Sequence, residues 1–353
     1  MHIKAFITHK KKERFSDCQD RFRVDAVTKS VAVSDGMGST WQQKIWAQLL
    51  VDKYTQDPEW TPSKESIAPL CREWKKGVED FIQKLKETNA SESLIYRNER
   101  FLAEGRSAGA TLVGARFHGK EWEGFVLGDS CLIEWNGTRA SFYTSQEKGS
   151  FDNYPDYFDS NVTKDGRGTP KPIRGILSTN SYILFVSDPF SDFLLEHNKN
   201  NDIAKYINRL LCVSTHDEFE LMVEDWRNEG MHNDDATLVI IQEDDKDDFS
   251  LIMIDDLDTL IKNENPEKVL DKVAKTPIDN HSEEQIYSIC SSDELNSNDD
   301  RKDEEEFLDK IIRRFNNMKI NQNRKVRKLV SKITEEMKKL IRSVMKEYTI
   351  TKK

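Results

Sequence analysis

The sequence contains few cysteines and no long apolar run. Only 5 of its 353 residues are cysteine, and none lies in a Cys-x-x-Cys pair, which argues against a disulfide framework and against a thiolate zinc site. No stretch approaches the roughly 20 apolar residues that a membrane-spanning helix requires, and the apolar start from Met1 to Ile7 is too short for a signal peptide. We therefore expect a protein of a reducing, cytoplasmic compartment with no membrane partner.

Charge is unevenly distributed along the chain, whose formal net charge is −10 at pH 7. Residues 1–242 have a mixed composition and predict one large folded domain. Residues 243–302 are strongly acidic and predict a solvated linker with short helices. Residues 303–353 are basic, which predicts a separate C-terminal element.

This C-terminal element has the pattern of an amphipathic helix. It contains no proline or glycine between Phe307 and Tyr348. Its apolar stripe is formed by Val326, Val330, Ile333, Met337, Leu340 and Val344. The stripe fits a coiled coil that mediates self-association and fits equally a helix folded back on its own domain. The basic stretch from Lys319 to Lys332 is interpreted as a solvated helix face, so we do not expect a nucleic-acid partner.

The first 242 residues predict an α+β domain. Apolar or alternating runs predict strands over residues 23–34, 110–117, 121–127, 131–135, 182–187 and 237–242. Two amphipathic patterns predict helices over residues 40–54 and 63–87. Because strands precede and follow a pair of helices, the order favours sheets with helices outside over a repeating βαβ unit.

Acidic signatures adjoin several of these strands. Asp20, Asp35, Asp188 and Asp234 each follow or precede a strand-forming run. Carboxylates at strand ends can meet at one edge of a sheet, and hard divalent cations prefer such oxygen ligands. The pattern therefore indicates a metal-dependent hydrolase.

The dipeptide Asp35-Gly36 suits a ligand shared by two cations. Glycine permits backbone conformations that other residues avoid, so the carboxylate and the following carbonyl can face one ion. Two cations about 3.5–4 Å apart can acidify a bridging water and clamp phosphate oxygens, as in two-metal phosphoryl hydrolases. Asp188 and Asp234 would complete the cage.

The order of these motifs resembles the metal-dependent protein phosphatases of type 2C, the PPM family, and its bacterial branch in particular. The resemblance spans about 230 residues and runs through Cys18-Gln19-Asp20, Asp35-Gly36-Met37-Gly38-Ser39, Ser107-Ala108-Gly109-Ala110-Thr111-Leu112, Gly128-Asp129-Ser130, Ser187-Asp188 with Ser191-Asp192-Phe193, and Asp234-Asp235-Ala236-Thr237-Leu238-Val239. It implies a β-sandwich of two antiparallel sheets flanked by antiparallel helix pairs, with a C-terminal helical extension in this chain.

The resemblance also implies a site with two Mn²⁺ or Mg²⁺ ions. Asp35 would bridge both ions, Gly36 would offer its carbonyl, and Asp188 and Asp234 would complete the ligand set. Asp20 would orient metal-bound water, and Asp129 would join Asp188 at a third, weaker site. The implied reaction is the hydrolysis of phosphoserine or phosphothreonine in a protein by a metal-activated bridging water, in opposition to a protein kinase.

Three positions depart from the family pattern. Met37 stands where many members carry a histidine that is proposed as the general acid, although bacterial relatives also carry Met. Pro189 replaces an expected glycine, and proline fixes φ and removes an N–H group. Phe15 stands where the phosphate-binding arginine is usual, so we consider His9 and Arg14 as phosphate-binding candidates, with Lys10, Lys11 and Lys12 nearby.

Two alternatives remain at this point. These departures also fit a catalytically weak scaffold of phosphatase fold that acts through its C-terminal helix. A different phosphohydrolase is suggested by Asp255-Asp256-Leu257-Asp258, but Leu260 stands where an aspartyl-phosphate enzyme needs threonine. Residues 148–174 fit either a flap that selects the substrate or a long surface loop.

Overall fold

The structure is a computed structural model that describes residues 1–145, 155–164, 166–179, 181–244 and 249–264. The chain divides into two compact units, residues 1–276 and 277–353, and every described residue belongs to the first. The predicted helix over residues 303–353 and most of the predicted acidic linker therefore lie outside the described residues.

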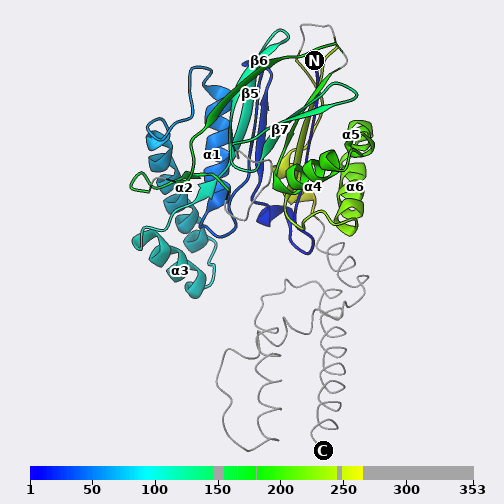
Figure 1. Ribbon diagram of the computed structural model, residues 1–353. Coiled ribbons are helices and arrows are strands. Elements are labelled where there is room, and N and C mark those ends of the chain that lie inside the picture. The colour runs from blue at the N-terminus through cyan, green and yellow to red at the C-terminus, as the bar shows by residue number, and fades with distance from the viewer. Residues whose placement is uncertain (146–154, 165, 180, 245–248, 265–353) are drawn as a thin grey trace, which may run out of the picture. The chain divides into compact units, whose positions relative to one another are not determined.

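Two sheets form the centre of the first unit (Figure 1). The first sheet has, in spatial order, β13 (Ser250–Ile254), β1 (His2–Thr8), β12 (Ala236–Gln242), β11 (Tyr182–Val186), β7 (Cys131–Trp135) and β8 (Ala140–Tyr143). The second has β10 (Lys171–Ile176), β6 (Glu121–Leu127), β5 (Leu112–His118), β3 (Ser30–Ser34) and β2 (Arg21–Asp25). Neighbouring strands are antiparallel except β1 and β13, which are parallel. Two short strands, β4 (Gly109–Ala110) and β9 (Phe158–Asp159), pair with each other and form a separate two-stranded sheet.

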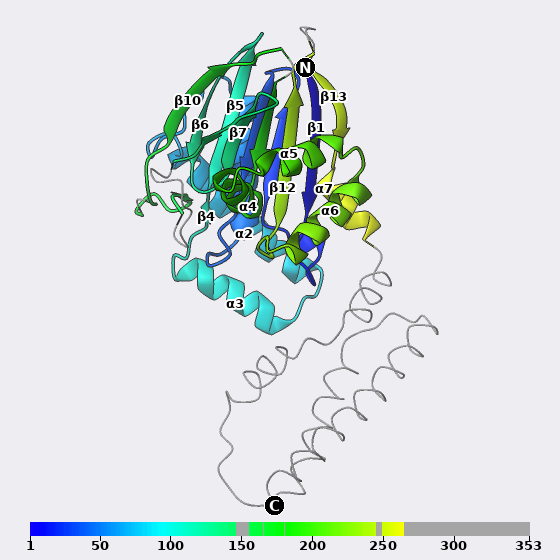
Figure 2. The same cartoon turned by 45° about the vertical axis from the view of Figure 1, so that its right-hand side comes forward.

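Helices cover the outer face of each sheet (Figures 1 and 2). The second sheet is flanked by α1 (Gln43–Gln56), α2 (Ala68–Glu87) and α3 (Glu92–Ala103), and the first sheet by α4 (Asp188–Lys199), α5 (Ile203–Cys212) and α6 (His216–Asn228). The turn η1 (Phe15–Asp17) follows β1, and α7 (Leu257–Asn263) follows β13. This arrangement confirms the predicted α+β sandwich with flanking helices.

Buried side chains form three layers. One cluster fills the space between the sheets and includes Ile3, Val33, Val113 and Phe185. The other two clusters lie between each sheet and its helices. Burial alternates at the start of β6, where Glu121 and Glu123 are exposed, whereas β7 is buried along almost its whole length, in agreement with the more apolar run at 131–135. The loops at the strand ends are thereby held on a rigid frame.

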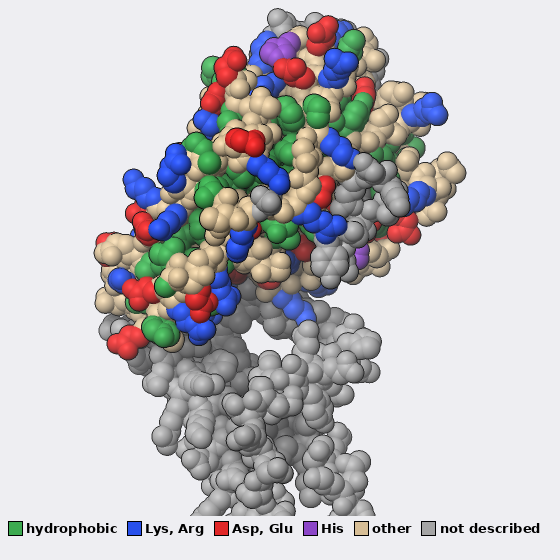
Figure 3. Space-filling model, turned by 60° about the vertical axis from the view of Figure 1, so that its left-hand side comes forward, with side chains coloured by type: hydrophobic (Ala, Val, Ile, Leu, Met, Phe, Trp, Pro, Cys, Tyr) green, Lys and Arg blue, Asp and Glu red, His purple; other side chains and the backbone are tan. Residues whose placement is uncertain are grey.

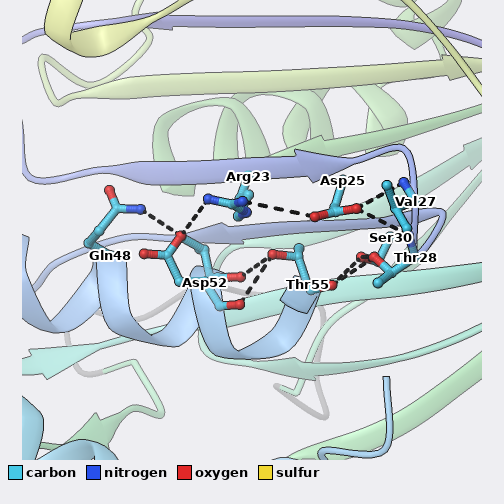
Figure 4. Close-up of polar contacts among 9 residues, drawn as sticks. Arg23, Asp25, Val27, Thr28, Ser30, Gln48, Asp52 and Thr55 are labelled. Atoms are coloured by element: carbon cyan, nitrogen blue, oxygen red, sulfur yellow. Dashed lines mark hydrogen bonds and ion pairs between the residues drawn. The ribbon is translucent and has the colours of Figure 1, made fainter. Parts of the chain in front are cut away.

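Helix α1 is fixed to the β2–β3 hairpin by polar contacts as well as by packing (Figure 4). Arg23 Nη1 lies 3.1 Å from Asp52 Oδ1, and Thr28 Oγ1 donates to the Thr55 carbonyl at 2.7 Å. The buried guanidinium of Arg116 donates to the carbonyls of Tyr54, Asp57 and Trp60 and so satisfies the end of the helix. On the side of the molecule that carries α1–α3, acidic, basic and hydrophobic side chains are interspersed (Figure 3).

The folded domain extends beyond residue 242, where the sequence analysis ended it. Strand β13 adds to the first sheet beside β1, and its backbone is tied by Ser250 N to Met1 O and by Asp255 N to Ala5 O, both at 2.9 Å. The acidic residues on either side of this strand concealed it, because they have the composition of a solvated linker.

None of the helices within the described ranges combines the length and the apolar character needed to cross a bilayer.

Candidate active site

The strand register brings the predicted carboxylates to one end of the sandwich. Asp35 follows β3 of the second sheet, and Asp188 follows β11 of the first. Asp234 precedes β12, which is antiparallel to β11 with Val186 opposite Leu238. Asp129 lies in the turn between β6 and β7. Each sheet therefore contributes carboxylates to the same region.

A cavity of about 300 Å³ opens at this end. Its lining includes every predicted metal ligand: Asp35, Gly36, Asp129, Asp188 and Asp234. Met37 and Thr111 also line it. Positions 35 and 234 are far apart in the sequence and meet here only because the two sheets pack face to face.

The carboxylates in the cavity are electrostatically strained. Burial, followed by repulsion from Asp188, raises the pKa of Asp35 well above its ordinary value. Burial and then repulsion from Asp129 and Asp234 raise the pKa of Asp188 in the same way. Such clusters favour the binding of positive charge, because a cation removes the repulsion that otherwise disfavours the ionised forms.

These residues fit divalent cations chemically. All are oxygen donors of the kind that Mg²⁺ and Mn²⁺ prefer, and the buried Oδ1 of Asp188 has no hydrogen-bond partner. In the part of the chain that the structure describes, no group of three or more His, Cys, Asp or Glu side chains is already arranged to hold a metal ion. The carboxylates thus share one cavity and offer it oxygen donors.

Gly36 is required for space rather than for an unusual backbone angle. It does not have a positive φ, contrary to the conformational reason given in the sequence analysis. A Cβ atom at this position would lie 2.9 Å from the carbonyl oxygen of Gln19 and 2.9 Å from Cγ of Gln43. Glycine therefore lets the Asp35 turn pack tightly against the segment that carries Asp20.

Asp20 does not line the cavity and is fully buried. Its Oδ2 accepts a hydrogen bond from Thr237 Oγ1 at 2.7 Å. Burial and then the negative charge of Asp235 raise the pKa of Asp20 to about 7. The role of Asp20 in orienting water stays a prediction.

The structure does not place His9 or Arg14 in the cavity lining. His9 packs edge-on against the Phe15 ring, with centroids 4.7 Å apart, and Arg14 is exposed. The cavity instead receives Lys10, whose Nζ lies 3.0 Å from Asp234 Oδ1. Phe15, at the position of the usual arginine, serves as a buried packing residue.

Backbone contacts fix Lys10 in this place. Its N–H group donates to Asp235 Oδ1 at 2.9 Å, and Gln19 N donates to Asp235 Oδ2 at 2.7 Å. Arg227 Nη2 donates to the carbonyls of His9 and Asp234. The buried carboxylate of Asp235 therefore joins the Lys10 loop to the Asp20 loop at the edge of the cavity.

The first turn of α4 accommodates Pro189. The helix starts at Asp188, and Pro189 lies in its first turn, where the missing N–H of proline costs nothing. Pro189 is buried and follows a residue that lines the cavity. The substitution of glycine by proline thus has a local structural explanation.

Sequence reasoning did not identify His232 as a site residue and assigned no role to Asp192. Both line the cavity, and His232 Nε2 lies 3.1 Å from Asp192 Oδ2. Asp192 belongs to a motif block, whereas His232 had only its position two residues before Asp234 as a signal.

The described part of the predicted flap, residues 148–174, begins beside the cavity. Pro155 lines the cavity. A Cβ atom on Gly109 would lie 2.9 Å from the Tyr157 ring and 2.8 Å from Met37 Sδ. Because Gly109 has no side chain, Tyr157 of this segment packs closely against it on the side of the cavity that contains Met37. Residues 146–154 lie outside the described ranges.

Helix-flanked sheets with an acidic cavity at one end are the arrangement of the type 2C phosphatase class. A family profile described as Protein phosphatase 2C matches residues 9–210, which is more than half of the 353 residues. The chain therefore belongs to the protein phosphatase 2C family.

Several solved structures are similar at low identity, among them the serine/threonine phosphatases Stp1 and PstP and the regulatory component PppA. Stp1 from Staphylococcus aureus is 14% identical, with 69% of this chain and 94% of that chain covered and a TM-score of 0.44. PppA from Pseudomonas aeruginosa is 13% identical, with 69% and 99% covered and a TM-score of 0.43. The catalytic domain of PstP, solved with 2 manganese ions, is 14% identical, with 69% and 99% covered and a TM-score of 0.40. No curated protein sequence matches this chain.

Proposed function

We propose that this chain is a Mn²⁺- or Mg²⁺-dependent phosphatase that removes phosphate from phosphoserine and phosphothreonine in proteins and opposes a protein kinase. The observation that carries the proposal is the shared cavity of Asp35, Asp129, Asp188 and Asp234, which come from both sheets. Membership of the protein phosphatase 2C family supports the reaction class.

The residues have distinct roles in this proposal. Asp35, the Gly36 carbonyl, Asp188 and Asp234 would hold two ions, and Asp129 with Asp188 would hold a third, weaker one. When bound, the ions supply positive charge for the phosphate oxygens and acidify water, which is the chemistry of two-metal hydrolases. Asp20, whose Oδ2 accepts a hydrogen bond from Thr237, would orient metal-bound water.

Lys10 is the proposed phosphate-binding residue. Its ammonium group lines the cavity and is held beside Asp234. Burial opposes its charge, but the hydrogen-bonded ion pair with Asp234 outweighs this effect and raises the pKa of Lys10. Lys10 therefore stays protonated at neutral pH and can donate charge-assisted hydrogen bonds to a phosphoryl group. The thioether of Met37 cannot protonate a leaving group.

The proposal is tested by phosphate release from p-nitrophenyl phosphate and from a phosphothreonine peptide, with and without Mn²⁺. We expect Asp35→Asn and Asp188→Asn to lower kcat/KM at least about 100-fold, because removal of a group that stabilises charge in the transition state has this magnitude. Asp25→Asn is the matched control, since Asp25 lies in β2 and does not line the cavity. Undiminished turnover in both site variants would refute the proposal.

Calorimetry with Mn²⁺, combined with the phosphate-release assays, distinguishes a working enzyme from a catalytically weak scaffold. A wild-type chain that binds Mn²⁺ but releases no phosphate from either substrate would be a binding protein of phosphatase fold, and the enzymatic proposal would then fall.

A further inference from the structure

Thr111 holds Asp35 through its backbone and its hydroxyl group. This residue lies between β4 and β5 and is 1% exposed. Its N–H group donates to the Asp35 carbonyl at 2.9 Å, and its Oγ1 accepts from the N–H group of Asp35 at 3.0 Å. Ser34 Oγ donates to the Thr111 carbonyl at 2.6 Å. The backbone around Asp35 is therefore fixed mainly by one neighbouring residue.

The same hydroxyl group reaches the loop that carries Asp129. Thr111 Oγ1 lies 2.8 Å from Ser130 Oγ, and both groups are buried. A hydroxyl oxygen can accept from Asp35 N and still share a second hydrogen bond with Ser130. The Thr111 side chain thus joins the turn after β3 to the turn between β6 and β7.

The methyl group of Thr111 packs against the second turn as well. Gly128 has a φ of +109°, and a Cβ atom there would lie 2.5 Å from Thr111 Cγ2. The threonine and the glycine therefore fit together closely, and the hydroxyl group of Thr111 is held next to the turn that contains Asp129.

We propose that Thr111 is a positioning residue that holds the Asp35 and Asp129 loops at a fixed separation and thereby sets the divalent-cation affinity of the candidate active site. This inference rests on the proposed function. Asp35 and Asp129 line one cavity and repel each other, so a structure that brings them together needs an attachment between their loops. Thr111 supplies that attachment through hydrogen bonds that do not involve the carboxylates.

The test compares Thr111→Val with Thr111→Ser in the full chain. Valine keeps the shape and removes the hydroxyl group, whereas serine keeps the hydroxyl group and removes the methyl group. Mn²⁺ affinity is measured by calorimetry, and the unfolding temperature is measured in EDTA. We expect Thr111→Val to weaken Mn²⁺ binding about tenfold, the lower end of the range for groups that orient ligands, and Thr111→Ser to stay within about threefold of wild type.

Ser130→Ala removes the other end of the bridge and leaves the Asp35 contacts intact, so it carries the test if the valine variant does not fold. Like Thr111→Val, Ser130→Ala should weaken Mn²⁺ binding. Affinity unchanged in Thr111→Val or in Ser130→Ala, or weakened equally in the valine and serine variants, would overturn the proposal. A wild-type chain that binds no Mn²⁺ overturns both this inference and the proposed function, whereas variants that bind as tightly as a working wild type overturn this inference alone.

Discussion

Lys10 illustrates how one side chain acquires a role from its surroundings. It is one of three consecutive lysines, and the sequence does not distinguish among them. In the structure Lys10 lines the cavity, whereas Lys11 forms an ion pair with Glu224 of α6 at 2.6 Å. The difference arises because Asp235 fixes the backbone of Lys10.

We predict that Lys10→Ala raises KM for a phosphothreonine peptide about tenfold. A hydrogen bond to a charged group contributes about 1.5–3 kcal/mol, and 1.4 kcal/mol corresponds to a factor of ten. Steady-state kinetics at saturating Mn²⁺ measure the effect. Lys11→Ala and Arg14→Ala are controls that should leave KM within about twofold of wild type. Equal effects of Lys10→Ala and Lys11→Ala would exclude a specific contact between Lys10 and phosphate.

The carboxylates were predictable from the sequence because each lies in a short motif, and these motifs occur in a fixed order. Lys10 was named only as one of three neighbouring lysines that could bind phosphate, and His232 was not identified, since nothing in their local sequence shows which way a loop side chain points. The reason offered for Gly36 was also incomplete. The close approach of Gln19 and Gln43 depends on packing between distant segments, which a local pattern does not contain.

At the scale of elements, β13 and α7 brace the loop that carries Lys10 and Asp20. Asp255, at the end of β13, accepts hydrogen bonds from Ile7 N at 2.9 Å and from His216 Nδ1 at 2.8 Å. The His216 ring lies 5.5 Å from the Phe15 ring in η1, and Phe15 N donates to Glu264 Oε1 at 3.2 Å. The back of this loop therefore rests on α6 and on the segment after β13.

The His216–Asp255 pair predicts a specific pH dependence of stability. Burial disfavours the protonated ring, but the hydrogen bonds that it donates to Asp255 and Glu220 outweigh this effect and raise the pKa of His216 from 6.5 to about 9. A raised histidine pKa contributes stability that is fully present below pH 6.5 and is lost as the pH rises through about 9.

We therefore expect His216→Gln to destabilise the protein by about 1 kcal/mol more at pH 6 than at pH 10, after allowance for solvent screening of a partly exposed pair. Urea unfolding at the two pH values measures the difference. His118→Gln is the control, because the His118 side chain is 67% exposed and lies 4.0 Å from Glu123. A pH-independent effect of His216→Gln would contradict the assignment of a charged pair.

Sequence patterns predicted the bounds of some strands and helices correctly and missed others. The runs at 121–127 and 131–135 were predicted as β6 and β7 with their observed bounds, because apolar strand formers are flanked there by turn residues. The run at 23–34 is two strands, β2 and β3, joined by a turn in which Lys29 has a positive φ. Helix α3 was not predicted, although Leu94, Ile95, Phe101 and Leu102 recur at helical spacing; of its residues only Asn98 is buried, while Phe101 and Leu102 are partly buried.

At the scale of the whole molecule, the candidate active site exists only when both sheets are packed. Asp35 belongs to the second sheet, and Asp188 and Asp234 belong to the first. The shared core of Ile3, Val33, Val113 and Phe185 therefore sets the separation of the carboxylates. Anything that weakens β1, a central strand of the first sheet, should also disturb the cavity.

Because the cavity depends on β1, the boundary of the catalytic domain depends on whether β13, the parallel neighbour of β1, is included. We propose that residues 1–264 form the folded catalytic unit, in place of residues 1–242. Without β13, β1 loses its parallel neighbour, and Phe249, which is 7% exposed, loses its place in the core beside Phe117. Burial of one phenylalanine contributes about 1.5–3 kcal/mol, and each lost hydrogen bond about 1 kcal/mol more.

We predict that a chain ending at Glu264 keeps the unfolding temperature of the described domain and its phosphate release, whereas a chain ending at Gln242 does not. A loss of roughly 3 kcal/mol corresponds to a decrease of roughly 6–12 °C for a domain of this size. The shorter chain should also lose kcat/KM, because Phe15 loses its contact with Glu264 and His216 loses Asp255, so that Lys10 is less firmly held. Calorimetric unfolding and p-nitrophenyl phosphate hydrolysis of the two chains, compared with the full chain, measure both effects. If the two truncated chains are equally stable and equally active, the catalytic domain ends at residue 242. In that case β13 and α7 do not help to position Lys10.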